Sequence, residues 1–125
     1  MADRVLGAGA GRVLVYVYGL FAVAAGARSG VQIATKLGEA PVAYLLSALA
    51  AVIYLVAAVA LARSARLVAL VACSVELLGV LTVGTLSLLV PSAFPDQTVW
   101  STYGSGYGFV PLVLPVLGLL WLRRR

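Results

Sequence analysis

The run from Leu67 to Val90 constrains the fold of this chain most, because it holds one charged residue, Glu76, among apolar and small side chains. A membrane-spanning helix needs about 20 predominantly apolar residues, and this run is long enough. A charged side chain near the centre of such a helix costs about 2.5–3.5 kcal/mol on insertion scales. The sequence therefore predicts a membrane helix whose surroundings offset the cost of burying Glu76.

Three further apolar segments have a similar composition. In the whole chain 63% of the residues are hydrophobic and 10% are charged, whereas soluble proteins carry about 25% charged residues. Pro41 suits the first turn of a helix, and Pro111 and Pro115 predict a kink in the last helix. We expect a single all-α domain over residues 1–125, a membrane-spanning four-helix bundle with spans at about 13–35, 41–62, 65–90 and 107–122.

The start of the chain allows two interpretations. Gly7 to Gly11 alternates Gly with Ala, which predicts a flexible lead before the first span. The basic start, the apolar stretch and the small residues Ala25-Gly26-Ala27 also fit a signal peptide. Because the apolar stretch is long and three more spans follow it, we favour a retained first helix.

The longest loop, residues 91–108, is expected between the last two spans. Asp96 can cap a short helical turn, and Gly104 can end it. In such a turn Trp100 and Tyr103 share a face, and both residue types favour the membrane–water interface. We therefore predict a short interfacial helix in this loop, over about Asp96 to Tyr103.

The distribution of basic residues predicts the orientation. Of the nine Lys and Arg residues, seven lie near the N-terminus, in the turn after the second span or at the C-terminus. Arg28 and Lys36 lie at the other end of the predicted spans. The positive-inside rule then places both termini in the cytoplasm, and so strong a bias argues against a dual-topology protein. Because the basic residues mark span ends and not one polar face, we expect no nucleic-acid binding despite the net charge of +5.

The composition also excludes several kinds of chemistry. The chain has no His and a single Cys, Cys73. It therefore lacks His ligands for haem or zinc and a His base. It also lacks the second Cys that an intrachain disulfide or a CxxC pair needs. We expect no enzyme activity, no metal and no cofactor.

Small residues surround Glu76 on its own side of the predicted helix. At helical spacing, that side carries Ala69, Ala72, Cys73, Gly79, Val80 and Val83. The opposite side is rich in Leu. Small residues mark helix–helix contacts in lipid, and Leu suits acyl chains. The sequence therefore places Glu76 toward protein.

Polar residues on three predicted helices fall at similar depths. With a rise of 1.5 Å per residue, Glu76 lies roughly 15 Å and Arg28 roughly 24 Å from the cytoplasmic side. We predict a polar intramembrane cluster of Arg28, Gln32, Tyr44, Ser47, Tyr54 and Glu76. Three roles stay open for Glu76: an ion pair with Arg28 that fixes helix packing, a protonated carboxyl bonded to a backbone carbonyl, or part of a ligand or ion site.

Four segments carry a resemblance to known membrane proteins. They are Tyr18-Gly19-Leu20-Phe21, Ala40-Pro41-Val42-Ala43-Tyr44, Val75-Glu76-Leu77-Leu78-Gly79-Val80 and Gly106-Tyr107-Gly108-Phe109-Val110-Pro111. This pattern resembles a family of small, uncharacterised four-span integral membrane proteins of actinobacteria. The Glu-Leu-Leu-Gly segment is also similar, more faintly, to DoxX-like four-helix proteins. The resemblance implies a membrane location and a fold but no activity.

Together these observations predict a small polytopic integral membrane protein without enzyme activity, in a bacterial plasma membrane. Eight of its nine basic residues are Arg, which is typical of GC-rich bacterial genomes. Its expected partners are the lipid bilayer and either another membrane protein or further copies of itself. The alternative is a small transporter or a lipid- or quinone-binding protein that uses the polar cluster. That alternative predicts a cavity lined by Tyr54 and Glu76.

Overall fold

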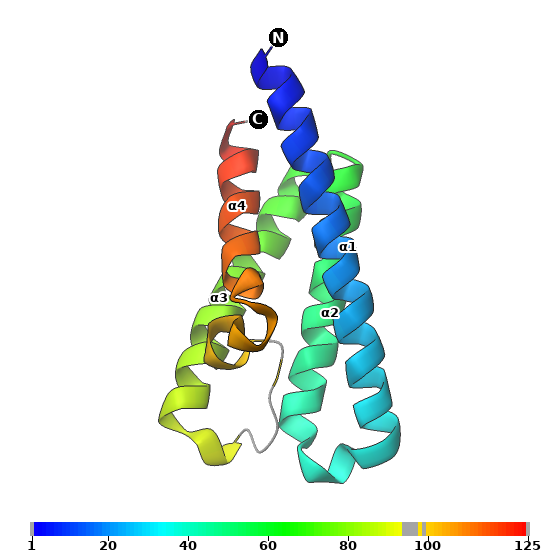
Figure 1. Ribbon diagram of the computed structural model, residues 1–125, viewed down its shortest axis with the longest axis vertical. Helices are drawn as coiled ribbons and strands as arrows, with labels where there is room; N and C mark the ends of the chain where they lie inside the picture. Colours follow the sequence, from blue (N-terminus) through cyan, green and yellow to red (C-terminus); the bar gives the residue numbers. More distant parts are fainter. Residues whose placement is uncertain (1, 94–97, 99, 125) are drawn as a thin grey trace.

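The computed structural model describes residues 2–93, 98 and 100–124, and this part of the chain is helical without a strand (Figure 1). Its four α-helices are α1 (Ala2–Lys36), α2 (Pro41–Ala62), α3 (Arg66–Leu89) and α4 (Val110–Arg124). Its short 3-10 segments are η1 (Leu37–Glu39), η2 (Pro91–Ala93) and η3 (Ser101–Tyr107). For the described residues, the predicted all-α class is confirmed.

Three of these helices are long and apolar enough to cross a membrane. The mean hydropathy is 1.4 for the segment Gly11–Glu39, 2.6 for α2 and 2.2 for α3. Less than half of each span is buried inside the protein, so most of its apolar surface points outward. Such a surface is compatible with a membrane-embedded protein, in which lipid replaces water around the helices. The fourth helix, α4, has 15 residues.

The first helix, α1, begins at Ala2, where a flexible lead was expected. Glycine costs about 1 kcal/mol relative to alanine inside a helix, and a tertiary contact offsets part of this cost. A Cβ atom on Gly11 would lie 2.7 Å from Cζ2 of Trp121 in α4. The glycine therefore lets the Trp121 ring lie directly against α1, and the prediction of a flexible lead is wrong for the residues from Ala2 onward.

A tight turn places α2 and α3 side by side. Ser64 adopts a left-handed conformation with φ of 56°. The Ala65 N–H then donates a hydrogen bond to the Ala60 carbonyl at 2.8 Å. These two features reverse the chain, and α3 begins at the next residue.

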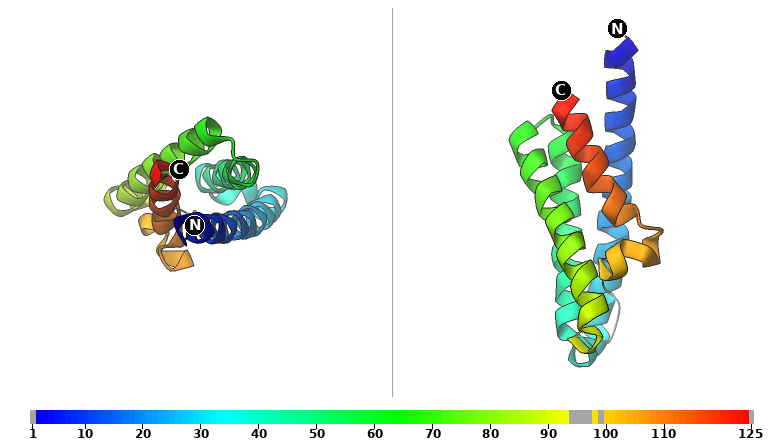
Figure 2. Two further views of the ribbon diagram at one scale, coloured as in Figure 1. Left: turned by 90° about the horizontal axis from the view of Figure 1, so that it is seen from above. Right: turned by 90° about the vertical axis from the view of Figure 1, so that its left-hand side faces the viewer.

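The helices enclose a core of small side chains. α1 packs against α2 along much of its length, and α3 packs against α2, α4 and η3. Both termini and the α2–α3 turn lie at the same end of the molecule (Figures 1 and 2). Alanine is the commonest buried residue, and a few larger side chains fill the space between the helices: Tyr18, Tyr54, Glu76, Val80, Trp100 and Leu114.

The loop before α4 does not form a regular helix in its described part. Residues 94–97 and 99, on which part of the predicted interfacial helix falls, lie outside the described residues. Within η3, the residues Thr102, Tyr103 and Gly104 have left-handed φ values of 51°, 59° and 82°. This irregular backbone follows the surface of α3 and carries Trp100 into the core.

Candidate functional site

Glu76 lies in the core, with a side chain that is 0% exposed. As the spacing predicts, small residues of α3 are buried on the same side: Ala69, Ala72, Cys73, Val80 and Val83. Neither carboxyl oxygen of Glu76 has a hydrogen-bond partner among the described residues. An ionised carboxylate at this position would therefore lack the bonds that offset burial of a charge.

Tyr18 and Cys73 are polar neighbours of Glu76. The Tyr18 hydroxyl, fully buried on α1, lies 3.5 Å from the sulfur of Cys73 on α3. Both groups interact electrostatically with the Glu76 carboxyl. Gly118 of α4 covers this region, since a Cβ atom there would lie 2.8 Å from the Cys73 sulfur. Three helices therefore meet beside Glu76, and their approach requires glycine in α4.

Tyr54 connects Tyr18 to the loop before α4. The ring centroids of Tyr54 and Tyr18 lie 6.1 Å apart, and Phe21 packs edge-on against Tyr54 at the same distance. The Trp100 indole N–H donates a hydrogen bond to the Tyr54 hydroxyl at 2.9 Å, and both side chains are buried. We call the five residues Tyr18, Tyr54, Cys73, Glu76 and Trp100 the inner cluster.

Glycines on α3 let the loop reach the inner cluster. A Cβ atom on Gly79 would lie 2.7 Å from the Trp100 ring, and one on Gly84 would lie 2.7 Å from the backbone nitrogen of Tyr103. Gly79 is ten residues before Leu89, the end of α3, so Trp100 lies roughly 15 Å inside that end. Trp100 was expected at the interface, and it lies in the core because these glycines leave room for it.

The polar groups of the loop are bonded as it enters the core. The Trp100 N–H donates to Oγ1 of Thr98 at 3.0 Å, and the Thr98 N–H donates to Oγ of Ser101 at 2.8 Å. The Thr102 N–H donates to Oγ of Ser87 on α3 at 2.8 Å. Irregular backbone inside a protein is tolerated only where other groups satisfy its N–H and C=O groups. These bonds therefore allow the loop to pack deeply between the helices.

The six residues of the predicted polar cluster are distributed along the helices. Tyr54 and Glu76 belong to the inner cluster. Three others are buried in the last part of α1 and the first part of α2: Gln32, Tyr44 and Ser47. Arg28 is exposed on α1. These positions do not test whether the six residues act together, and the six-residue cluster stays a prediction.

Sequence reasoning did not assign Tyr18, Cys73 and Trp100 to the site. Tyr18 and Phe21 fall on one face of a helix by their spacing, but this spacing does not reveal the contact of Tyr18 with α3. Cys73 was interpreted as a packing residue because it is small and close to Glu76 in sequence. The burial of Trp100 could have been predicted only from Gly79, because a glycine on the inward side of α3 allows another segment to approach closely.

Within the described ranges, no group of three or more His, Cys, Asp or Glu residues is placed to hold a metal ion. No protein-family model, curated protein or solved structure matches the chain. The family resemblance therefore stays a prediction.

Replacing Tyr54 with phenylalanine should destabilise the protein by about 1–3 kcal/mol, because the buried Trp100 N–H loses its acceptor. Unfolding of the purified protein in mild detergent, followed by circular dichroism, measures this change. Tyr16→Phe is the matched control, because Tyr16 is 75% exposed on α1 and loses the same hydroxyl. Equal stability of the two variants would contradict a role for the Tyr54–Trp100 bond.

Proposed function

We propose that the chain is a small polytopic protein of a bacterial plasma membrane, without enzyme activity, that serves as an accessory or self-associating membrane component. In this proposal the four α-helices form a membrane-spanning bundle with α4 as the fourth span. Both termini are cytoplasmic, since seven of the nine basic residues lie at that end. The observation that carries the proposal is the complete burial of Glu76 and Tyr54 in the inner cluster.

Glu76 and Tyr54 are both 0% exposed, which supports a structural role for this cluster, and two hollows in the described part of the chain are lined by other residues. One lies at the end of the molecule that holds both termini and most basic residues (the basic end), between the end of α2, the start of α3 and the end of α4. The other is an apolar groove between α2 and α3. Neither Glu76 nor Tyr54 lines either hollow. A ligand site built on these two residues would need them to border open space.

A neutral Glu76 fits this proposal best among the roles left open by the sequence. An ionised carboxylate without hydrogen bonds in an apolar interior costs several kcal/mol, and the neutral form avoids this cost. The neutral carboxyl packs against α1 beside the Tyr18 hydroxyl. In this form Glu76 holds α1 and α3 together as a polar but uncharged side chain.

One face of α1 favours contact with another protein. Ala24, Ala27, Arg28 and Val31 lie close together at helical spacing and are exposed. Small side chains allow two helices to approach closely in lipid. This face therefore suits close contact with a partner helix or with a second copy of the chain.

Purification from the native membrane in mild detergent tests the proposal. Light scattering should give a protein mass of at least twice the 12.9 kDa of one chain, or a second membrane protein should co-purify. Ala27→Leu should reduce this association, because its larger side chain keeps the helices apart. Ala62→Leu, on the exposed end of α2, is the control. A strictly monomeric protein without a partner would contradict the proposal.

One observation favours a second candidate, a small transporter or a lipid- or quinone-binding protein. The Glu76 carboxyl is fully buried, and ionisable groups inside membrane proteins often mark ion or proton pathways. This candidate requires a carboxyl that changes its charge. The two candidates therefore differ in the expected behaviour of Glu76→Gln.

A further inference from the structure

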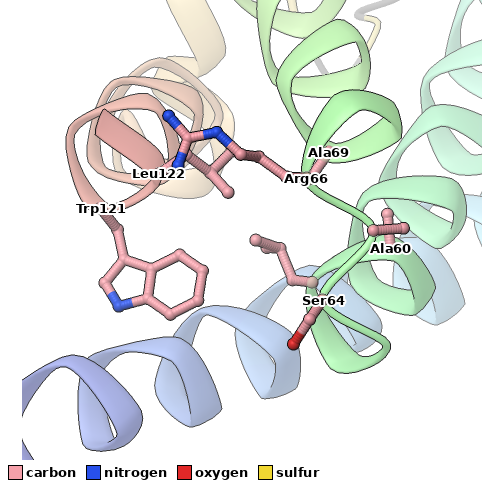
Figure 3. Close-up of a pocket in the computed structure, with 8 residues that line it drawn as sticks. Ala60, Ser64, Arg66, Ala69, Trp121 and Leu122 are labelled. Atoms are coloured by element: carbon pink, nitrogen blue, oxygen red, sulfur yellow. The ribbon is translucent and has the colours of Figure 1, made fainter. Parts of the chain in front are cut away.

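We propose that the hollow at the basic end binds the phosphate of an anionic phospholipid headgroup (Figure 3). The hollow has a volume of about 120 Å³, which suits a headgroup and not a whole lipid. The residues that matter for the argument come from α2, from the turn, from α3 and from α4: Ala60, Ser64, Arg66, Ala69, Trp121 and Leu122. The proposal needs a membrane-embedded chain with this end at headgroup level, but it does not need the accessory function.

Small residues create the hollow. Ala60 at the end of α2 and Ala69 in the first turns of α3 are both buried, and their small side chains leave space next to α4. The Trp121 ring forms the opposite wall (Figure 3). Its ring also lies against Gly11 of α1, where a Cβ atom would come within 2.7 Å. This contact with α1 therefore holds the Trp121 wall in place.

This end of the chain is strongly positive. In the sequence, one acidic residue, Asp3, accompanies seven basic residues there: Arg4, Arg12, Arg63, Arg66, Arg123, Arg124 and Arg125. The side chains of Arg12, Arg63, Arg66 and Arg123 are exposed. Clusters of Arg at the cytoplasmic surface attract anionic lipids electrostatically. Charge complementarity therefore favours an anionic lipid over a zwitterionic one.

The groups at the rim of the hollow suit a phosphate. The Arg66 guanidinium extends along α4 beside Leu122 (Figure 3), and guanidinium groups form paired hydrogen bonds with phosphate oxygens. The Ser64 hydroxyl is a further donor. Ala65, the N-cap residue of α3, gives no side-chain cap, so N–H groups of the first turn stay available to an anion. Trp121 suits the headgroup level of a bilayer.

Lipid titration of the purified full chain, read by native mass spectrometry in mild detergent, tests the site. Phosphatidylglycerol should bind with an affinity at least about tenfold higher than phosphatidylcholine, and Arg66→Gln should weaken it by about tenfold, because a charge-assisted bond to the phosphate is lost. Arg63→Gln removes the same charge from the same turn but does not line the hollow. It should weaken binding by less than about threefold.

A second variant keeps every charge. Ala69→Leu fills the hollow and should reduce phosphatidylglycerol binding as strongly as Arg66→Gln, and circular dichroism checks that the variant is folded. Equal effects of Arg63→Gln and Arg66→Gln would overturn the site in favour of a diffuse basic surface. Equal binding of the two lipids by the wild-type protein would overturn it as well. Displacement of the lipid by millimolar inorganic phosphate would overturn the assignment to a lipid headgroup.

Discussion

Glu76→Lys is expected to prevent the protein from folding, whereas Glu76→Gln should keep its stability within about 1 kcal/mol of the wild type. The lysine places an ammonium group without a partner among Tyr18, Tyr54 and Cys73, and such a group costs at least about 3 kcal/mol. Glutamine has nearly the same size and shape as a neutral glutamic acid. The comparison therefore reports the charge of Glu76 inside the folded protein.

Circular dichroism and size-exclusion chromatography in mild detergent measure this difference. Ser74→Lys is the matched control, because Ser74 is exposed on the same helix, two residues away. The Ser74→Lys variant places a Lys on the exposed side of the apolar helix α3 but does not bury its charge in the core. If Glu76→Gln destabilises the protein as strongly as Glu76→Lys, Glu76 is ionised and paired. If the glutamine variant folds normally but loses the native phenotype, the transporter or ligand-binding candidate is favoured.

Gly79→Leu is expected to expel Trp100 from the core. A Cβ atom at position 79 already overlaps the Trp100 ring at 2.7 Å, and the rest of the leucine side chain would enlarge the overlap. Overpacking of this kind costs about 1–3 kcal/mol. Loss of the bond from Trp100 to Tyr54 adds to this destabilisation.

Tryptophan fluorescence measures the movement directly. The chain has two Trp residues, so a Trp121→Phe background isolates the emission of Trp100. The emission should shift to longer wavelength in Gly79→Leu, and a water-soluble quencher should reduce it more. Gly30→Leu is the control, because a Cβ atom on Gly30 meets nothing within 4 Å. Emission in Gly79→Leu that matches this control would show that Trp100 does not pack on α3.

Sequence patterns were sufficient to predict the all-α class and the direction of Glu76. Length and composition define α2 and α3 almost by themselves, because apolar runs of this size suit a membrane helix. The small residues beside Glu76 predicted that its side chain points inward, and it is fully buried. These predictions depend on spacing within one helix, and such spacing can be read directly from the chain.

The composition of the site depended on contacts that spacing does not reveal. The Gly- and Ala-rich start has low helix propensity, yet α1 begins at Ala2 and packs through Gly11 against Trp121. Trp100 follows a typical interfacial pattern in sequence, but Gly79 gives it a place in the core. In both cases a glycine lets an aromatic ring from a later segment of the chain pack directly against a helix. Tertiary contact therefore overrode local preference.

If α4 is the fourth span, as we propose, its short length has a consequence for the surrounding bilayer. With 15 residues, α4 is roughly 22 Å long, whereas the hydrocarbon region of a typical bilayer measures about 30 Å. The 24 residues of α3 reach roughly 36 Å beside it. This hydrophobic mismatch costs fractions of a kcal/mol per Å. In such a bundle the bilayer next to α4 is expected to be thinner, which would favour short-chain lipids on that side of the protein.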